Sequence, residues 1–281
     1  MMPTEPIRFL ASRSPTEAAS WKMIGLPFDA ASSYRRGAAY GPAEIRRASD
    51  SIESYSPYRD RDLANLSFCD AGDLELQALP PDDAVAAVRE FYRRTDVRNL
   101  FALGGDHTVT CGAVEGLLDA GCRFSVLHLD AHLDLREEYT GGKYSHACVA
   151  RRIAERIGPD RLVQWGMRSG EAAEFHWAEK HGTYFGRDAR TFRDACHKLR
   201  GRPVYLTLDL DLFDPAELPA VGNPEPGGVT FREFLAMLND LRDLDILAAD
   251  VVELAPPWDP TGRSSVTSAE IVRELLLNII R

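Results

Sequence analysis

The sequence predicts an α/β fold in which a mostly parallel sheet carries helices on both faces. Short, largely apolar runs such as residues 100–103 and 204–208 are typical of strands that are buried on both faces. Longer amphipathic segments separate these runs, and this alternation favours parallel strands joined by crossover helices. No Gly/Ser linker, low-complexity tract or fixed-period repeat divides the chain. Residues 1–281 are therefore predicted to form a single domain.

The predicted strands are eight short segments of largely apolar residues. In chain order they span residues 21–27, 66–69, 99–103, 124–129, 162–166, 183–185, 203–208 and 246–252.

The predicted helices lie between these strands, and several carry the residues expected at a helix start. Pro42 follows Gly41 at a first-turn position, where the missing N–H of proline costs nothing. Thr230 precedes Glu233 with the spacing of a capping box. The helix-like segments span residues 42–54, 82–94, 107–120, 146–157, 171–181, 231–241 and 268–280.

The composition is that of a globular protein with a sizeable core, since 44% of the residues are hydrophobic and 27% are charged. The 33 basic and 43 acidic residues give a formal net charge of −10, which argues against a nucleic-acid partner. The same charge is mildly compatible with a small cationic substrate.

The chain is expected to be cytoplasmic. Its five cysteines are scattered without a Cys-x-x-Cys pair, which favours buried, reduced thiols over a disulfide framework. Residues 1–15 lack the apolar stretch of a signal peptide. No segment approaches the ~18–20 apolar residues of a membrane span, so no membrane partner is expected.

The most informative segment is residues 125–135, which read SVLHLDAHLDL. An apolar, strand-like run ends here in Asp130, His132 and Asp134, which occupy alternate positions. In an extended backbone, residues two apart point to the same side. These three side chains are therefore expected to converge at one strand end.

Two further predicted strands end in similar residues. Residues 100–103 run into a Gly-Gly-Asp-His sequence that ends at His107, and residues 204–208 run into Asp209 and Asp211. Open α/β sheets bind their ligands at the carboxyl ends of the strands. The sequence therefore predicts one metal-dependent site built by His107, Asp130, His132, Asp134, Asp209 and Asp211.

The chemistry of this set favours two Mn²⁺ ions. Four carboxylates and two imidazoles exceed what one ion needs, so some carboxylates are expected to bridge two ions. Oxygen-rich ligands without thiolates suit Mn²⁺ better than structural Zn²⁺. Two divalent ions ~3.5–4 Å apart share one hydroxide that is nucleophilic near neutral pH. His128 is interpreted as a hydrogen-bonded core histidine or a partner of a ligand, and His176, His181 and His197 as surface residues.

On these motifs the chain resembles the ureohydrolase family, which includes the arginases and agmatinases. The resemblance covers nearly the whole length. It rests on SYRRG at 33–37, GPAEIR at 41–46, GGDH at 104–107, DAHLD at 130–134, DLD at 209–211 with Asp214-Pro215, and Glu253 within VVELAP.

The resemblance implies a three-layer α/β/α, arginase-like fold with an eight-stranded, mostly parallel sheet, in a homo-oligomer of three or six subunits. It also implies two Mn²⁺ ions per subunit and hydrolysis of a guanidino group to urea and an amine by a metal-bridging hydroxide. One ion would be held by His107, Asp130, Asp134 and Asp209. The other would be held by His132, Asp130, Asp209 and Asp211.

Two further residues receive catalytic roles from the resemblance. Glu253 is implied to bind the guanidinium group, and a carboxylate can accept two of its N–H donors in parallel. His146 is implied to handle the proton of the departing amine, which a histidine can supply near pH 7. A surface or helix-capping histidine is the competing interpretation of His146.

The substrate is predicted to be a small cationic guanidino compound, first of all agmatine, which would yield urea and putrescine. The Ser-Gly-Asn segment by which arginases contact the amino-acid end of arginine is replaced by residues 142–145, which include Lys143. Family members often have Pro-Gly-Thr-Gly-Thr-Pro where residues 219–224 read PAVGNP, so the changed segment Ala220 to Asn223 leaves the substrate open. The alternatives are 4-guanidinobutyrate, whose carboxylate Lys143 could hold, and formimino-glutamate. A zinc deacetylase needs fewer ligands than the six found here.

Overall fold

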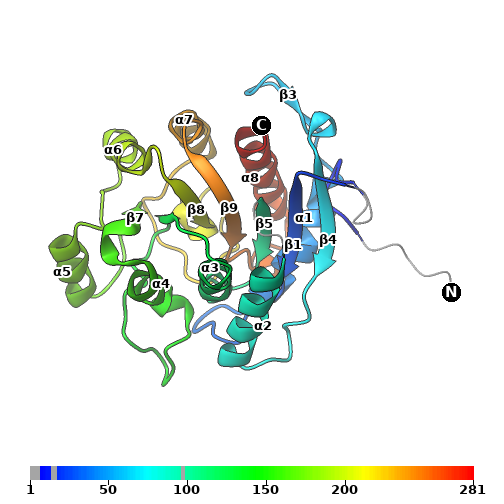
Figure 1. Cartoon of the computed structure of the whole chain (residues 1–281). Helices are drawn as coiled ribbons and strands as arrows, with labels where there is room; N and C mark the ends of the chain where they lie inside the picture. Colours follow the sequence, from blue (N-terminus) through cyan, green and yellow to red (C-terminus); the bar gives the residue numbers. More distant parts are fainter. Residues whose placement is uncertain (1–6, 14–17, 96–98) are drawn as a thin grey trace.

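A parallel sheet of seven strands organises the molecule (Figure 1). The computed structural model describes residues 7–13, 18–95 and 99–281, so of the segment 1–15 it covers residues 7–13 only. The strands follow the order β4-β1-β5-β9-β8-β6-β7 and every neighbouring pair is parallel. Their bounds are β1 (Trp21–Leu26), β4 (Phe68–Asp73), β5 (Leu100–Gly104), β6 (Ser125–Leu129), β7 (Leu162–Trp165), β8 (Pro203–Asp209) and β9 (Asp245–Val252).

Helices cover both faces of the sheet, which confirms the predicted three-layer α/β/α architecture (Figure 1). One face packs against α1 (Gly41–Ser49), α6 (Ala189–Leu199), α7 (Phe231–Leu241) and α8 (Arg263–Ile279). The other packs against α2 (Pro81–Arg94), α3 (Val109–Asp119), α4 (Val149–Ile157) and α5 (Ala172–His181). No helix of the described residues is long and apolar enough to cross a membrane.

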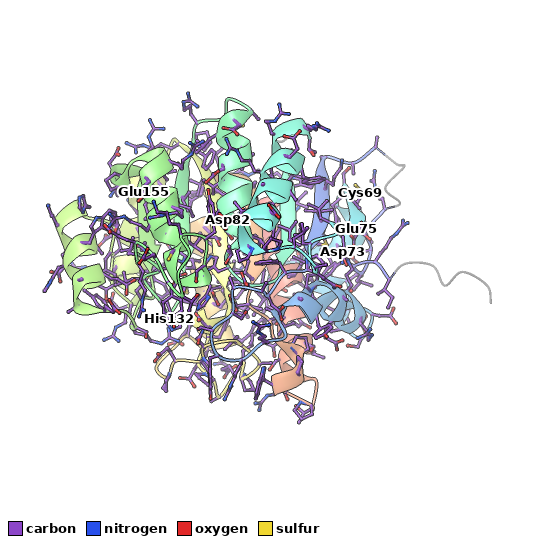
Figure 2. The ribbon with its side chains drawn as sticks, turned by 90° about the horizontal axis from the view of Figure 1, so that it is seen from below. Cys69, Asp73, Glu75, Asp82, His132 and Glu155 are labelled. Atoms are coloured by element: carbon purple, nitrogen blue, oxygen red, sulfur yellow. The ribbon has the colours of Figure 1, made fainter. Side chains whose placement is uncertain are left out.

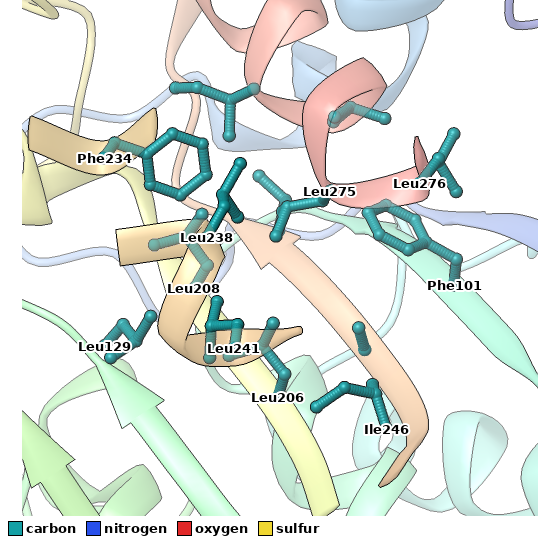
Figure 3. Packing of buried hydrophobic residues seen from close by; sticks show 14 of the residues in the cluster. Phe101, Leu129, Leu206, Leu208, Phe234, Leu238, Leu241, Ile246, Leu275 and Leu276 are labelled. Atoms are coloured by element: carbon teal, nitrogen blue, oxygen red, sulfur yellow. The ribbon is translucent and has the colours of Figure 1, made fainter. Parts of the chain in front are cut away.

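The strands feed two hydrophobic cores because successive side chains of a strand point to opposite faces. In β5, Phe101 and Leu103 join the core under α7 and α8, whereas Leu100 and Ala102 join the core under α2 and α3. Figure 3 shows the first core, where Phe234, Leu238 and Leu241 of α7 meet leucines of β8 and α8. Because both faces are buried, the strands read as apolar runs without alternation.

The main sheet has seven strands, and the prediction of eight is wrong by one. The predicted strand at 183–185 does lie beside β7, where the N–H of Gln164 donates to the Thr183 carbonyl oxygen at 2.7 Å. It makes a single parallel bridge between Gln164 and Tyr184. Gly182 before it and Gly186 after it both have positive φ, so the extended run is too short for a longer ladder.

One helix and one short hairpin lie outside the predicted set. Helix α6 was not predicted, although Phe192, Ala195, Cys196 and Leu199 have the i, i+3, i+4, i+7 spacing of one buried helical face. A short antiparallel hairpin joins β2 (Tyr55–Ser56) to β3 (Arg61–Asp62), in a polar segment without a strand pattern.

All five cysteines are free, and four of them are buried. In the view of Figure 2, Cys69 lies on the same side of the molecule as Asp73 and Glu75, and His132 lies toward the other side. Burial raises the pKa of the thiols of Cys111, Cys148 and Cys196. These three side chains therefore stay protonated and are poor nucleophiles.

Candidate functional site

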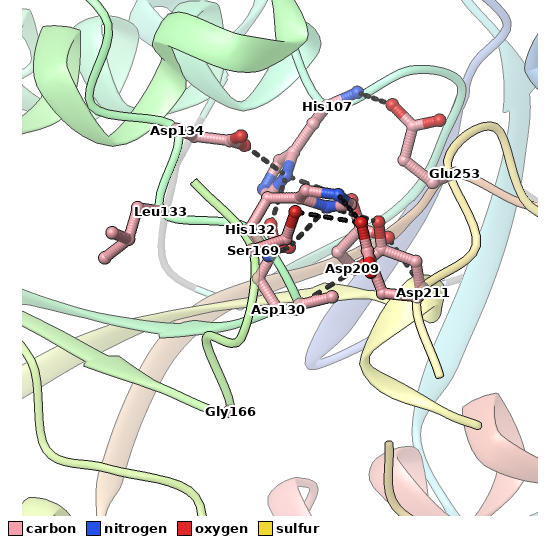
Figure 4. A network of polar contacts seen from close by, with 12 residues as sticks. His107, Asp130, His132, Leu133, Asp134, Gly166, Ser169, Asp209, Asp211 and Glu253 are labelled. Carbon is pink, nitrogen blue, oxygen red and sulfur yellow. Dashed lines mark hydrogen bonds and ion pairs between the residues drawn. The ribbon is translucent and has the colours of Figure 1, made fainter. Parts of the chain in front are cut away.

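The six predicted ligand residues lie together at the carboxyl edge of three strands (Figure 4). His107 follows β5, Asp130 to Asp134 follow β6, and Asp209 ends β8 just before Asp211. Five of the six are buried and His132 is half-buried. We call this set the His/Asp cluster.

One half of the cluster surrounds Nδ1 of His107. Three carboxylate oxygens face this nitrogen, from Asp130 at 3.1 Å, Asp209 at 3.2 Å and Asp134 at 3.4 Å. The other ring nitrogen, Nε2, lies 2.9 Å from Thr207 Oγ1 in β8. When Nε2 carries the proton and donates it to Thr207, Nδ1 keeps a lone pair that could ligate a cation together with the three carboxylate oxygens.

The other half of the cluster surrounds Nδ1 of His132. Oδ2 of Asp211 lies 2.8 Å from this nitrogen and Oδ1 of Asp130 lies 3.6 Å from it. Asp130 thus directs one oxygen to each histidine. Ligand atoms of Asp130, His132 and Asp211 all lie within 4.8 Å of one another, and so do those of His107, His128, Asp130 and Asp134.

Backbone hydrogen bonds orient the carboxylates of the cluster. The N–H of His132 donates to Asp130 Oδ1 at 2.5 Å, and the N–H of Asp211 donates to Asp209 Oδ1 at 2.8 Å. Asp134 has a φ of 52°, in the left-handed region that costs a residue other than glycine roughly 1–3 kcal/mol. The surrounding structure therefore holds Asp134 in a strained conformation that turns its carboxylate toward His107.

The electrostatics of the cluster fit divalent cations. Burial and the charges of Asp211 and Asp130 raise the pKa of Asp209 well above its ordinary value. Nδ1 of His107 is buried and has no hydrogen-bond partner among the described residues. Four carboxylates in so small a volume repel one another, and two divalent ions would carry the four positive charges that balance them. The donor set, which consists of oxygens and imidazole nitrogens, suits Mn²⁺.

Glu253 follows β9 and lies next to the cluster, with only 5% of its surface exposed. Its Oε1 accepts a hydrogen bond from the N–H of His107 at 2.7 Å. Its Oε2 faces Gly222, where an added Cβ would lie 2.9 Å away. Gly222 belongs to the changed segment 219–224, which is fixed by the hydrogen bond from Ala255 N–H to the Ala220 carbonyl oxygen.

His146 begins the short 3₁₀ helix His146–Cys148 and is half-buried. Its Nδ1 lies 2.9 Å from the Ala31 carbonyl oxygen and its Nε2 lies 3.1 Å from Ser33 Oγ. The ring of Tyr139 lies edge-on to it at 5.7 Å. Contacts with a second segment of the chain thus fix this ring, as is not expected of a surface histidine.

A cavity of about 280 Å³ lies over the cluster and connects it to His146. Its wall includes the two cluster residues His132 and Asp134. The wall also includes Asn223, the last residue of the changed segment Ala220 to Asn223, which was predicted to influence the substrate. Six further polar residues of the wall were not predicted: Ser33, Arg136, Tyr139, Ser169, Glu171 and Glu174. Ser33 belongs to the segment SYRRG, which contributes to the family resemblance, and Asn223 belongs to the segment 219–224, which departs from the family pattern. The other residues belong to no motif.

One expectation about a charged residue changes in the structure. Lys143 is exposed, and Arg136 rather than Lys143 lines the cavity among the described residues. The guanidinium of Arg136 pairs with Glu171 Oε1 at 3.1 Å and packs over the ring of Tyr139. The cation at the cavity wall is therefore already paired with a carboxylate.

The remaining histidines occupy the places that the sequence indicated, except that His181 is half-buried. His128 is buried, and its Nε2 lies 2.7 Å from Asp130 Oδ2. His176 and His197 are exposed, while Nδ1 of His181 lies 2.8 Å from the Trp177 carbonyl oxygen.

Comparisons with known proteins give matches that cover nearly the whole chain. A model of the arginase family matches residues 19–278. An agmatinase from Bacillus subtilis (strain 168) is 37% identical over 279 residues, which cover 97% of this chain and 96% of that protein. A guanidinobutyrase from Pseudomonas aeruginosa is 32% identical and covers 94% of this chain and 88% of that protein. The structure of the agmatine ureohydrolase of Thermoplasma volcanium matches with a TM-score of 0.86 at 29% identity, covering 99% of this chain and 95% of that chain.

Proposed function

The chain belongs to the arginase family, and we propose that it is a Mn²⁺-dependent agmatine ureohydrolase that yields urea and putrescine. The observation that carries this proposal is the pair of donor sets that share Asp130. One is centred on His107 Nδ1 and the other on His132 Nδ1. Such a pair suits two ions that share a bridging carboxylate.

The two ions would be held by the residues of the His/Asp cluster. His107, Asp130, Asp134 and Asp209 would hold one ion, and His132, Asp130, Asp209 and Asp211 the other. When bound, the ions supply the positive charge that makes water a nucleophile near neutral pH.

Glu253 and His146 would serve the substrate. The guanidinium carbon is a poor electrophile, so its orientation matters, and the Glu253 carboxylate can accept N–H donors from a planar cation. One of its oxygens is already fixed by His107 N–H at 2.7 Å, which leaves Oε2 for the substrate. His146 would provide the proton that the departing amine needs.

The charges of the cavity favour agmatine, whose far end is an ammonium group. Glu171 and Glu174 face the cavity, and Arg136, the one arginine or lysine among the described residues that line it, lies 3.1 Å from Glu171 Oε1 and 3.7 Å from Glu174 Oε2. The two carboxylates exceed the one guanidinium by one negative charge, which an ammonium group would balance, whereas a carboxylate group would compete with Glu171 and Glu174 for Arg136. The similarity to the agmatinase from Bacillus subtilis agrees with this choice.

A second candidate substrate is 4-guanidinobutyrate. Arg136 lines the cavity and could pair with its carboxylate if Glu171 moved away. The guanidinobutyrase from Pseudomonas aeruginosa, at 32% identity, adds weight to this alternative.

A substrate panel tests the proposal. Purified protein loaded with Mn²⁺ is offered agmatine, 4-guanidinobutyrate, arginine and formimino-glutamate, with urea measured for the first three and formamide for the last. We expect urea from agmatine at a kcat/KM at least tenfold above the others. Preference for 4-guanidinobutyrate would retain the chemistry and overturn the substrate. Absence of product from all four, with two ions bound, would overturn the proposed function.

A further inference from the structure

The segment SYRRG at 33–37, which contributes to the family resemblance, has no part in the metal site, yet it places one hydroxyl in the cavity. Ser33 lines the cavity, and its Oγ lies 3.1 Å from Nε2 of His146. The two residues are 113 positions apart in the chain. Their contact therefore depends on the tertiary fold and not on local geometry.

Hydrogen bonds hold the loop that carries Ser33 at three points. The N–H of Ala31 donates to Asp106 Oδ2 at 3.2 Å, directly beside His107. The N–H of Gly37 donates to Asp29 Oδ2 at 2.9 Å, and Trp258 Nε1 donates to the Arg36 carbonyl oxygen at 2.9 Å. Gly37 has a φ of 133°, and a Cβ there would lie 2.8 Å from Pro257. The position of Ser33 is thus fixed from both sides.

Both nitrogens of the His146 ring already have partners. The Ala31 carbonyl oxygen can only accept, so Nδ1, at 2.9 Å, must carry a hydrogen for this contact. Nε2 is then the nitrogen that gains and loses the catalytic proton. Among the described residues, its hydrogen-bond partner is the Ser33 hydroxyl, which also faces the cavity.

We propose that Ser33 relays the proton from His146 to the departing amine. In the charged imidazole, Nε2–H donates to Ser33 Oγ while the Ser33 O–H donates to the amine nitrogen. The Nε2–H bond breaks as a new Oγ–H bond forms, and the original Oγ–H bond breaks as the amine gains its proton. The electron pair of the C–N bond stays on the departing nitrogen. Serine is regenerated and neutral His146 remains. The water that replaces the consumed hydroxide releases one proton as it forms the next hydroxide, and this proton can return to His146 through solvent because Ser33 is exposed.

This inference rests on the proposed hydrolysis, because a relay requires a leaving group that needs a proton. The relay requires the hydroxyl of Ser33, whereas a purely steric role would require only a side chain of similar size. A hydroxyl at this position should matter for turnover, while substrate binding and metal content should not depend on it.

Three substitutions of Ser33 test the relay. Ser33→Val removes the hydroxyl and fills the space that a replacing water would use, Ser33→Ala leaves that space, and Ser33→Thr keeps the hydroxyl. Ser32→Ala is the matched control, since the Ser32 hydroxyl in the same loop has no hydrogen-bond partner among residues 7–13, 18–95 and 99–281. The measurements are kcat and KM for agmatine and bound Mn²⁺ per chain.

We expect Ser33→Val to lower kcat at least tenfold, and complete loss of general acid catalysis would lower it by about 10²–10⁴. KM should change less than about twofold, and Ser33→Thr should restore most of the turnover. Because residues that act as a unit are not additive, Ser33→Val combined with His146→Ala should be no slower than His146→Ala alone. Wild-type kcat in Ser33→Val, or effects that multiply in the double variant, would overturn the relay. A wild-type protein without activity on any guanidino substrate would instead overturn the proposed function.

Discussion

The N–H of His107 donates to Oε1 of Glu253 at 2.7 Å and so joins the carboxyl ends of the neighbouring strands β5 and β9. Glu253 is fixed a second time, because its own N–H donates to the Gly105 carbonyl oxygen at 2.8 Å. Its φ of 71° lies in the left-handed region. The residue that would bind substrate is therefore positioned by the segment that would bind metal, before any substrate arrives.

Replacement of Glu253 by glutamine removes the negative charge of the side chain and keeps its size and shape. The amide oxygen can still accept from His107 N–H, so the fold and metal content should be retained. Loss of the carboxylate removes charge-assisted hydrogen bonds of about 1.5–3 kcal/mol, and kcat/KM for agmatine should fall by about 10–100-fold. Steady-state kinetics with a metal assay on the same sample check this. Unchanged kcat/KM in Glu253→Gln would remove Glu253 from the substrate site.

Gly222→Ala should displace the Glu253 carboxylate. The added Cβ would lie 2.9 Å from Glu253 Oε2, closer than carbon and oxygen ordinarily approach. We expect kcat/KM for agmatine to fall at least about tenfold with little change in thermal stability. A displacement of the Glu253 carboxylate by about 1 Å would misorient the guanidinium group of the substrate. Gly142→Ala is the control, since a Cβ there meets nothing within 4 Å. Equal kcat/KM values for Gly222→Ala and Gly142→Ala would show that catalysis does not depend on the position of Glu253 Oε2.

Asp130→Asn and Asp209→Asn should each abolish turnover by removing one negative charge from the His/Asp cluster. Asp130 Oδ2 and Asp209 Oδ2 lie 3.1 Å and 3.2 Å from His107 Nδ1, so either change weakens the set around that nitrogen. We expect activity to fall more than about 100-fold and bound Mn²⁺ to drop below two ions per chain. Asp194→Asn on the exposed side of α6 is the control. Near-wild-type turnover with a full complement of metal in either variant would refute the bridging assignment.

Asp259 should stabilise the fold in a pH-dependent way. Burial alone would raise the pKa of Asp259, but hydrogen bonds from Thr261 and Ser264 outweigh it and lower the pKa from 3.8 to about 2. A pKa below the unfolded value means that the stabilisation is complete above about pH 4 and is lost as the pH falls toward 2. Asp259→Asn should cost about 1–2 kcal/mol at pH 7. Urea unfolding at pH 7, 4 and 3 checks this, and a difference from wild type that stays constant with pH would contradict it.

The strands could be predicted because they are buried on both faces, and a long apolar run has few alternatives to a central strand. Leu100 to Leu103 and Pro203 to Leu208 are examples, and the acids that follow them were placed together by the rule that parallel strands share a carboxyl edge. The edge of the sheet was harder to predict. At 183–185 the extended run ends on both sides because Gly182 and Gly186 have positive φ, and the presence of a glycine does not by itself fix the sign of its φ.

The cavity wall could not be predicted in the same way, because it is assembled from loops. Ser33 reaches His146 across 113 positions, and Arg136 reaches Glu171 through a salt bridge between separate segments. Such contacts follow from where the strands end and how the loops fold back, and no spacing in the chain encodes them. Helix α6 is a different case, since Phe192, Ala195, Cys196 and Leu199 carried a readable pattern within a highly charged segment.

The most direct test of a dimanganese agmatine ureohydrolase is to measure bound Mn²⁺ and product formation on the same preparation. Metal-depleted protein is titrated with Mn²⁺, and urea and putrescine are quantified from agmatine at each step. The account predicts two tightly bound ions per chain, equal amounts of urea and putrescine, and loss of both products after chelation. Full activity in the chelated protein, or two bound ions without urea, would contradict it.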